Sequence, residues 1–242
     1  MKILVISDIH ANITALEAVL LAAGEIDAAW CLGDIVGYGA DLNECVQRVR
    51  SLPNLLCVKG NHDMAISNPE SLAEFNHAAS QAILLSRKII TEDNIAFLQK
   101  LPERVSNDIA TCAHGSPRNP IWEYILDGHV AKENLENFST PLGFVGHSHL
   151  PMMFLDEAIG KPMSRHFPLP GEQVSLTTRA ILNPGSVGQP RDNDPRASFG
   201  IFNPGTMTWQ IQRVEYDIPA VQARIIAAGL PERHARRLSE GW

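Results

Sequence analysis

The chain opens with MKILVISDIH (residues 1–10), in which a short apolar run is followed at once by an aspartate and a histidine. The run from Ile3 to Ile6 has the length and composition of a buried strand. From Ile13 to Ala23 apolar side chains recur at helical spacing, and Asn12 can cap that helix. A second apolar run, Ala28 to Leu32, then completes a β-α-β unit, which predicts an α/β fold.

The same alternation continues through the first half of the chain. A second helix is expected from Leu42 to Arg50, and another strand run follows from Leu55 to Val58. The first sixty residues therefore predict consecutive βα units with a parallel sheet. Two further apolar runs, Ile109 to Ala113 and Leu142 to Val145, also have the length of buried strands.

The segment at about 69–102 contains no good strand and predicts a helical excursion from the sheet. One helix is expected from Ser71 to Arg87 and a second from Thr91 to Leu101. Pro102 ends the second helix.

The second half of the chain is expected to form a second, more antiparallel sheet. Its short segments are punctuated by proline and glycine, with strands near residues 179–182, 198–202 and 207–214. Helices are expected at about 217–240, with a break at Gly229-Leu230-Pro231. Because no linker or repeat divides the chain, residues 1–242 are predicted to form a single domain.

Composition and charge limit the classes of function. The chain is 45% hydrophobic and carries a formal net charge of −7, as an ordinary globular protein does. No apolar stretch approaches the roughly 20 residues of a membrane span, and no cleavage site follows the first strand. The basic residues are dispersed except for Arg233, His234, Arg236 and Arg237, which disfavours non-specific binding of nucleic acid.

The cysteine usage indicates a reducing compartment. The chain has Cys31, Cys45, Cys57 and Cys112, which form no CxxC pair, and three of them sit in apolar strand-like runs. Buried free thiols are therefore favoured over disulfides or metal ligands. A cytoplasmic location follows from this interpretation.

Metal-binding residue types follow each of the five apolar runs. They are Asp8 and His10, Asp34, the trio Asn61, His62 and Asp63, then His114, and finally His147 and His149. Ligands of open α/β sheets bind beyond the carboxyl ends of the strands, so these segments are expected to converge. A single Asp there is commonly a turn former and a single His a core residue, but nine residues at five strand ends favour one site. Seven carboxylate, imidazole and amide ligands without thiolate suit two ions of Mn²⁺, Fe or Zn²⁺.

These residues stand in a recognisable set of motifs. The motifs are Asp8-Ile9-His10, Gly33-Asp34, Gly60-Asn61-His62-Asp63, Ala113-His114-Gly115 and Gly146-His147-Ser148-His149. Their order and spacing resemble those of the calcineurin-like metallophosphoesterases. The later stretch Asn183-Pro184-Gly185-Ser186-Val187-Gly188, with Arg191 after it, resembles the bacterial and archaeal small-phosphodiesterase branch of that family.

The resemblance implies both a fold and a metal centre. The fold is a four-layer αββα sandwich, in which two mixed β-sheets are flanked by helices. One ion would be held by Asp8, His10 and His149, and the other by Asn61, His114 and His147, with Asp34 bridging the two. Mn²⁺ is the foremost expectation for both ions, with Fe, Ni²⁺ and Zn²⁺ as alternatives.

The resemblance also implies hydrolysis of a small phosphodiester or phosphomonoester. Two cations about 3.5–4 Å apart generate a bridging hydroxide, neutralise the phosphoryl oxygens and align an in-line attack. His62 would be the general acid at the leaving oxygen, and Asp63 an orienting or structural group. No protein nucleophile is needed, which agrees with the absence of a Gly-x-Ser-x-Gly elbow or a Walker loop.

Departures from relatives narrow the activity. Protein serine/threonine phosphatases carry Gly-Asp-x-Val-Asp-Arg-Gly, whereas this chain has Gly37 and Tyr38 in place of the Asp and Arg. A protein phosphatase is therefore disfavoured, and so is a bacterial-type bis-nucleoside tetraphosphatase, which shares the Asp-Arg version. Ala11 stands where small relatives often have glycine.

Several other residues have two possible roles, one functional and one structural. Asn12 could contact a substrate phosphate or only cap its helix. Arg191 could clamp the phosphate or be a solvated loop charge, and Tyr38 could stack on a base or pack. Residues expected to be structural, exposed or core are His77, His129, His166, His234, Trp30 and Trp209.

Three other functions compete with a phosphoesterase, and one of them, a regulatory metal-binding module, would bind metal without turnover. A nuclease is disfavoured by the acidity and by the lack of a basic, aromatic-lined tract. A non-catalytic metal-binding scaffold for protein interaction is the alternative from another class, but such a protein is expected to lose the acid histidine or some ligands. A small phosphate ester is therefore the expected partner, and the sequence leaves a homo-oligomer open.

Overall fold

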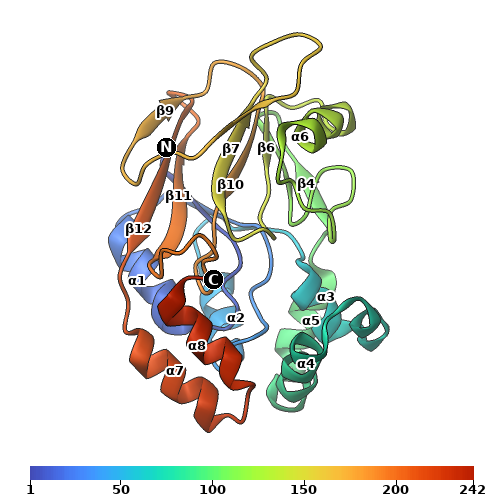
Figure 1. Ribbon diagram of the computed structural model, residues 1–242, viewed down its shortest axis with the longest axis vertical. Helices are drawn as coiled ribbons and strands as arrows, with labels where there is room; N and C mark the ends of the chain where they lie inside the picture. The colour runs from blue at the N-terminus through green and yellow to red at the C-terminus, as the bar shows by residue number, and fades with distance from the viewer.

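Two six-stranded β-sheets form the body of the computed structural model, which describes every residue from Met1 to Trp242 (Figure 1). The first sheet has the order β3-β2-β1-β11-β12-β9, with β1 (Ile3–Ile6), β2 (Ala28–Cys31), β3 (Leu56–Cys57), β9 (Gln173–Ser175), β11 (Ala197–Asn203) and β12 (Thr208–Val214). The second has the order β4-β5-β6-β10-β7-β8, with β4 (Arg104–Ser106), β5 (Ala110–Ala113), β6 (Leu142–Phe144), β7 (Pro151–Leu155), β8 (Ser164–His166) and β10 (Ala180–Pro184).

Both sheets mix parallel and antiparallel pairs. In the first sheet β1 is parallel to β2 and antiparallel to β11, and in the second β5 is parallel to β6 and antiparallel to β4. The predicted sandwich of two mixed sheets flanked by helices is therefore confirmed. The parallel β1-β2-β3 unit is confirmed as well.

Aromatic side chains fill the space between the sheets. The ring of Phe144, from the second sheet, lies 5.2 Å from Trp30 and 5.6 Å from Trp209, both from the first. All three are buried, and Trp209 is fully so, which confirms the two tryptophans as core residues. Their burial fixes the distance between the sheets and hence the distance between strand ends.

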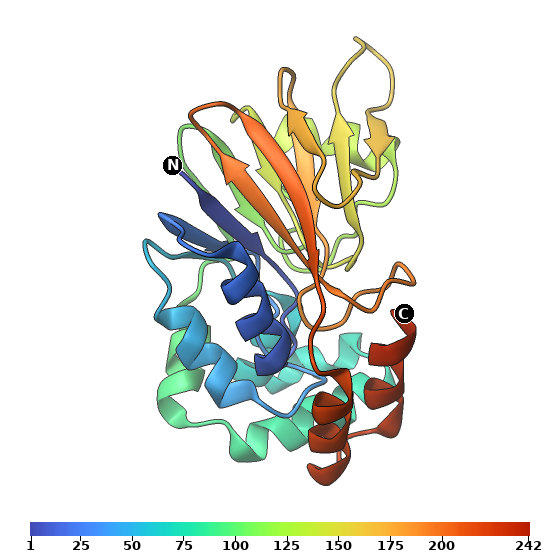
Figure 2. The ribbon, with the colours of Figure 1, turned by 90° about the vertical axis from the view of Figure 1, so that its left-hand side faces the viewer.

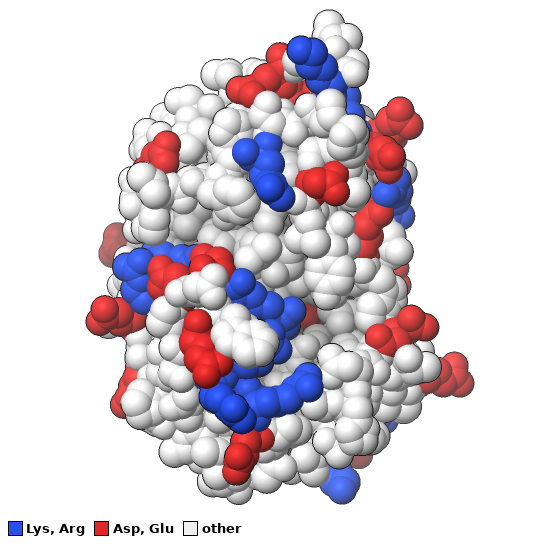
Figure 3. Space-filling view, in the orientation of Figure 1, with Lys and Arg blue, Asp and Glu red and all other residues white.

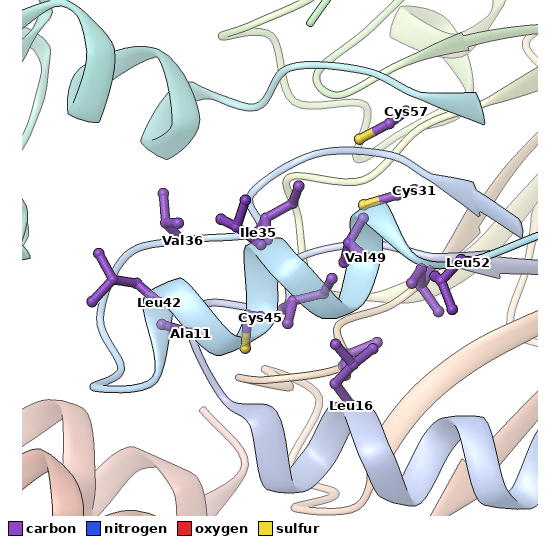
Figure 4. Packing of buried hydrophobic residues seen from close by; sticks show 14 of the residues in the cluster. Ala11, Leu16, Cys31, Ile35, Val36, Leu42, Cys45, Val49, Leu52 and Cys57 are labelled. Atoms are coloured by element: carbon purple, nitrogen blue, oxygen red, sulfur yellow. The ribbon is translucent and has the colours of Figure 1, made fainter. Parts of the chain in front are cut away.

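Helices α1 (Ile13–Ala23) and α2 (Leu42–Arg50) cover the outer face of the first sheet. Their apolar faces, with residues such as Leu16 and Val49, join one buried cluster with the strands and with the loop residues Ile35 and Val36 (Figure 4). The cysteines are all buried and unpaired, as predicted. This packing holds the loops after β1 and β2, which carry the first predicted ligands.

The remaining helices lie mainly at one end of the molecule. In Figures 1 and 2 this end holds α3 (Asn61–Ser67), α4 (His77–Ile89), α5 (Glu92–Lys100), α7 (Ile218–Ala227) and α8 (Glu232–Glu240). The outer face of the second sheet is covered by α6 (Gly128–Asn134) and a 3₁₀ turn, η2 (Leu135–Asn137). No helix has both the length and the apolar character that a bilayer crossing requires.

The predicted single helix from Ser71 to Arg87 is wrong at its start. A 3₁₀ helix, η1 (Pro69–Glu74), comes first, and α4 begins only after Asn76. The Asn76 side chain accepts a hydrogen bond from the Ala79 N–H at 3.1 Å, so it caps a new helix and does not lie inside an old one. The second predicted helix and the break between the two C-terminal helices are confirmed by α5, α7 and α8.

The expectation that the late strands form a sheet of their own is also wrong. β11 and β12 join the first sheet beside β1, whereas β10 joins the second beside β6. The second sheet also contains β4, β5 and β6, which precede the late strands in the chain. Pairing with β11 buries the free edge of β1, which the chain's early βα units leave open.

Candidate metal centre

The loops that follow β1, β2, β3, β5 and β6 meet at one place, although these strands belong to two sheets. The predicted ligands Asp8, His10, Asp34, Asn61, His114, His147 and His149 are all buried there. Three overlapping groups of side chains have ligand atoms within 4.8 Å of one another, and they take in every predicted ligand except Asn61, with His62 in addition. The predicted side chains therefore do lie together, but they come from the strand ends of two sheets and not of one.

The first group consists of Asp8, His10 and His149. The two imidazole Nε2 atoms are 3.1 Å apart, and Asp8 Oδ1 lies 3.2 Å from Nε2 of His149. The Nδ1 of each histidine faces a backbone carbonyl, that of Val36 at 3.1 Å for His10 and that of Gln189 at 2.6 Å for His149. Donation of the Nδ1 protons to these carbonyls leaves both Nε2 lone pairs directed at each other.

The second group consists of Asn61, His114 and His147. Nε2 of His114 lies 3.0 Å from Asn61 Oδ1 and 3.1 Å from His147 Nδ1. The Nδ1 of His114 faces the Leu32 carbonyl at 2.9 Å, so its Nε2 is the atom turned towards the centre. Burial would lower the pKa of His114, but Asp34 outweighs it and raises that pKa to about 9, so a metal ion would displace a proton from this nitrogen. Imidazole, amide and carboxylate donors are the mixed set that first-row divalent metals accept.

Asp34 stands between the two groups. Its Oδ2 is 3.4 Å from Nε2 of His114 and 3.7 Å from Nε2 of His10. Its Oδ1 accepts the backbone N–H of His62 at 2.9 Å, which leaves Oδ2 turned towards both groups. Burial would raise the pKa of Asp34, but the adjacent His114 and His62 outweigh it and hold that pKa well below its ordinary value.

The side chains of the centre suit the metal ion that the motifs imply. The lone pairs of His10 and His149 face each other, and the buried Asp8 Oδ1 beside them has no hydrogen-bond partner. Burial holds the pKa of both histidines well below the ordinary value, so they are in the neutral form that binds metal. Acceptors that face one another in a buried space repel unless a positive charge lies among them.

Backbone conformation at the centre is strained. Left-handed φ angles occur at Asp8 (54°), His10 (48°), Asp34 (53°), His147 (64°) and His149 (61°). Non-glycine residues adopt this region uncommonly, at a cost of about 1–2 kcal/mol each. Five of the seven predicted ligands share it, and such clustering is typical of functional sites.

Two glycines let the loops approach closely. A Cβ on Gly60 would lie 2.1 Å from Asp34 Oδ1, and one on Gly33 would lie 2.5 Å from the backbone nitrogen of Gly60. No side chain fits at either position. The glycines of the Gly-Asp and Gly-Asn-His-Asp motifs are therefore required for Asp34 and Asn61 to reach the same centre.

The two predicted catalytic residues differ in placement. His62 is buried, lines the cavity above the ligands, and its Nδ1 has no hydrogen-bond partner. Asp63 lies beneath the loop after β2, where its oxygens accept the N–H groups of Asp34 (2.8 Å), Ile35 (3.0 Å) and Val36 (3.3 Å) and that of Gly60. Asp63 therefore positions Asp34 and does not face the cavity.

The two predicted substrate residues also differ. Asn12 caps α1, accepting from the Ala15 N–H at 3.0 Å, and donates to the Gly188 carbonyl at 3.1 Å. Both of its polar groups are thus engaged in structure. Arg191 lines the cavity, is fixed by Gln189 at 3.0 Å, and keeps a buried Nε without a partner.

The cavity beside the ligands has a volume of about 330 Å³, and sequence reasoning missed part of its wall. Phe75 and Trp122 form an edge-to-face pair at 5.4 Å, and Tyr124 stacks on His147 at 3.9 Å. These aromatic residues lie in irregular segments with no motif, so only their aromatic character could have drawn attention to them. On the opposite side Tyr38 packs between His62 and His234 at 4.4 and 4.7 Å.

Comparison with known proteins agrees with this geometry. The calcineurin-like phosphoesterase superfamily domain matches residues 1–207. The chain belongs to this superfamily. It therefore has the fold of the calcineurin-like phosphoesterases, and its buried histidines and aspartates could hold metal.

Relatives of this phosphoesterase cover it from end to end. An uncharacterised protein of Methanocaldococcus jannaschii is 41% identical over 246 residues, which is 99% of this chain and 98% of that one. A crystal structure of a metallophosphoesterase from Sphaerobacter thermophilus is 44% identical, with a TM-score of 0.90 and coverage of 100% and 99%. A hypothetical protein of Pyrococcus horikoshii, 20% identical with a TM-score of 0.78 and coverage of 100% and 98%, shares the fold.

Proposed function

We propose that this phosphoesterase hydrolyses a small phosphodiester or phosphomonoester with the help of two divalent cations, Mn²⁺ foremost. The observation that carries the proposal is the pair of facing donor groups, Asp8 with His10 and His149, and Asn61 with His114 and His147. Asp34 lies within 4 Å of a histidine from each group. When bound, the cations would supply positive charge to the phosphoryl oxygens and lower the pKa of a coordinated water.

The chain's own residues would complete the reaction. Arg191 would bind a non-bridging phosphoryl oxygen, since its Nε is buried without a partner beside the ligands. His62 would give a proton to the leaving oxygen, because it lines the same cavity and its Nδ1 makes no hydrogen bond. Asp63 would keep Asp34 in its left-handed conformation through the four N–H groups that it binds.

The same features disfavour a non-catalytic scaffold. The full donor set and His62 remain together, and the cavity above them is large enough for a small ligand. A cavity of about 330 Å³ lies at the lower end of small-molecule sites, which suits a compact ester better than a polymer.

The test is hydrolysis of bis-p-nitrophenyl phosphate and p-nitrophenyl phosphate by metal-stripped protein that is reloaded with single metals. Turnover should require metal and should fall at least a hundredfold in Asp34→Asn. His62→Ala should lose more activity on an alkyl phosphate than on a nitrophenyl ester, because a good leaving group needs no acid. His129→Ala, at an exposed position on α6, is the matched control. Wild-type protein that binds metal and cleaves neither ester nor alkyl phosphate would contradict the proposal.

A further inference from the structure

Three arginines gather at the end of the chain next to the candidate active site. Arg233, Arg236 and Arg237 lie on α8 and line a cavity of about 400 Å³ together with Glu240 and Trp242. Figure 3, in the orientation of Figure 1, shows blue Lys and Arg side chains gathered over the region of α8 and the C-terminus, with red acidic side chains beside them. The chain as a whole is acidic, with a formal net charge of −7, whereas α8 carries three arginines and two glutamates, Glu232 and Glu240.

These arginines lack the carboxylate partners that others have. Arg118, Arg196 and Arg224 each contact an Asp or Glu at 2.5–2.8 Å. None of the three on α8 pairs with an Asp or Glu side chain: Arg237 donates its Nε to the main-chain oxygen of Trp242, and the nearby Glu240 accepts from the Trp242 indole at 2.6 Å. Unpaired cations held close together are unfavourable in the absence of an anion.

The cluster adjoins the candidate active site. Arg233 donates to Asn76 Oδ1 at 3.0 Å, and Asn76 lines the catalytic cavity. The His234 ring packs on Tyr38 at 4.7 Å, and the guanidinium of Arg191 lies 6.0 Å from the same Tyr38 ring.

The pKa of Arg237 is affected by two neighbouring arginines, Arg191 and Arg233. Arg237 is half-buried, and burial together with the charges of Arg191 and Arg233 lowers its pKa to about 10. Arg191, in the cavity wall, is therefore near enough to Arg237 to affect its pKa, which places the arginines of α8 beside the arginine of the cavity.

The position of α8 is fixed by its packing against α7. In α7, Arg224 donates to both oxygens of Asp41 at 2.8 and 2.9 Å and to Thr14 at 2.6 Å. Apolar residues of α7 and α8, Val221 and Leu238 among them, form one buried cluster. Both helices lie beyond residues 1–207, the part that the superfamily domain matches, so this feature concerns which ester is bound and not the shared chemistry.

We propose that Arg233, Arg236 and Arg237, beside Arg191, bind a second phosphate group of the substrate. The inference rests on the proposed function for the scissile phosphate. The substrate class is then a compact ester with a further phosphate beyond the one attacked. Guanidinium forks bind phosphate oxygens in pairs, and a phosphate carries close to two negative charges at neutral pH, which suits several arginines.

The first test is binding of tripolyphosphate and of inorganic phosphate to metal-free protein, measured by calorimetry. The variant is Arg236→Gln/Arg237→Gln, and the matched control is Arg165→Gln, an exposed arginine on β8. Tripolyphosphate should bind more tightly than phosphate, and the double variant should lose about 10- to 100-fold of that affinity. Equal affinity in the double variant and in the control would overturn the subsite.

The second test joins the subsite to the active site. With free Mn²⁺ held constant, tripolyphosphate should compete with bis-p-nitrophenyl phosphate better than phosphate does, and the double variant should lose this advantage. Arginine-dependent binding without competition would overturn the link to the substrate and would favour another anionic partner for α8. Absence of ester hydrolysis by loaded wild-type protein would overturn the proposed function alone, because the metal-free binding experiment decides the subsite separately.

Discussion

At the scale of single residues, the centre combines ordinary side chains with unusual backbone. His10 and His149 are oriented by carbonyls that bind their Nδ1 atoms, so the ligand nitrogen is chosen by the fold. The types of these residues and their convergence could be predicted from sequence. Their left-handed φ angles could not, because local sequence favours such angles only at glycine and, less often, at Asn or Asp.

Asp63 offers the sharpest test at this scale. Its two oxygens accept four backbone N–H groups, those of Asp34, Ile35, Val36 and Gly60. In Asp63→Asn the amide N–H₂ would face two of these donors, so we expect a loss of about 2–4 kcal/mol in the free energy of unfolding. The measurement is urea unfolding of metal-free protein.

A positioning role also predicts weaker metal binding. Displacement of Asp34 in Asp63→Asn should lower metal affinity about 10- to 100-fold. The control is Asp108→Asn, at an exposed position, which should stay within about 0.5 kcal/mol of wild type. Wild-type stability and metal affinity in Asp63→Asn would show that the four hydrogen bonds do not hold the loop.

At the scale of elements, sequence patterns predicted the regular core and missed the irregular walls of the site. The strands β1, β2, β5 and β6 coincide with the predicted apolar runs, because a strand that is buried on both faces needs apolar residues throughout. The short strands near the surface and the segment with Trp122 and Tyr124 have no such periodicity. The break at Asn76 was missed because a helix cap and a helix interior both tolerate Asn between apolar residues.

The segment that carries Trp122 and Tyr124 depends on one carboxylate. Glu123 accepts from Arg118 Nε at 3.0 Å and from Asn134 Nδ2 at 2.9 Å. Burial raises the pKa of Glu123, but these hydrogen bonds outweigh it and lower that pKa to about 2 from its ordinary 4.5. A depressed pKa gives stability that is complete above about pH 4.5 and is lost as the pH falls towards 2.

We therefore expect Glu123→Gln to lower the Tm by about 2–4 °C at pH 7. The difference from wild type should shrink as the pH falls from 5 towards 2, because the wild-type carboxyl then becomes protonated. Differential scanning calorimetry over this range measures it. Glu133→Gln is the control, since Glu133 contacts only the exposed side of Arg118. A Tm difference between Glu123→Gln and wild type that does not change with pH would refute the stabilising role of the ionised Glu123 carboxylate.

At the scale of the whole molecule, the two sheets act as one frame for the centre. Asp8 and Asp34 follow strands of the first sheet, whereas His114 and His147 follow strands of the second. Sequence patterns could place each ligand at a strand end but not on its sheet, because the strands pair with partners far along the chain. Ile3 of β1 pairs with Phe202 of β11, and Leu142 of β6 pairs with Ala180 of β10. Packing of Phe144 against Trp30 and Trp209 sets the spacing of the two sheets.

Metal should therefore stabilise the entire fold and not the loops alone. Without a cation the Nε2 lone pairs of His10 and His149 and the unpartnered oxygen of Asp8 face one another, and the ligands come from both sheets. A ligand present at 100 times its Kd stabilises by about 2.7 kcal/mol, so Mn²⁺ loading should raise the Tm by about 5–10 °C over protein in EDTA. Asp34→Asn should lose most of this shift and Asp108→Asn should keep it. Equal Tm values with and without metal in the wild type would mean that the two donor groups do not bind ions strongly enough to couple the sheets.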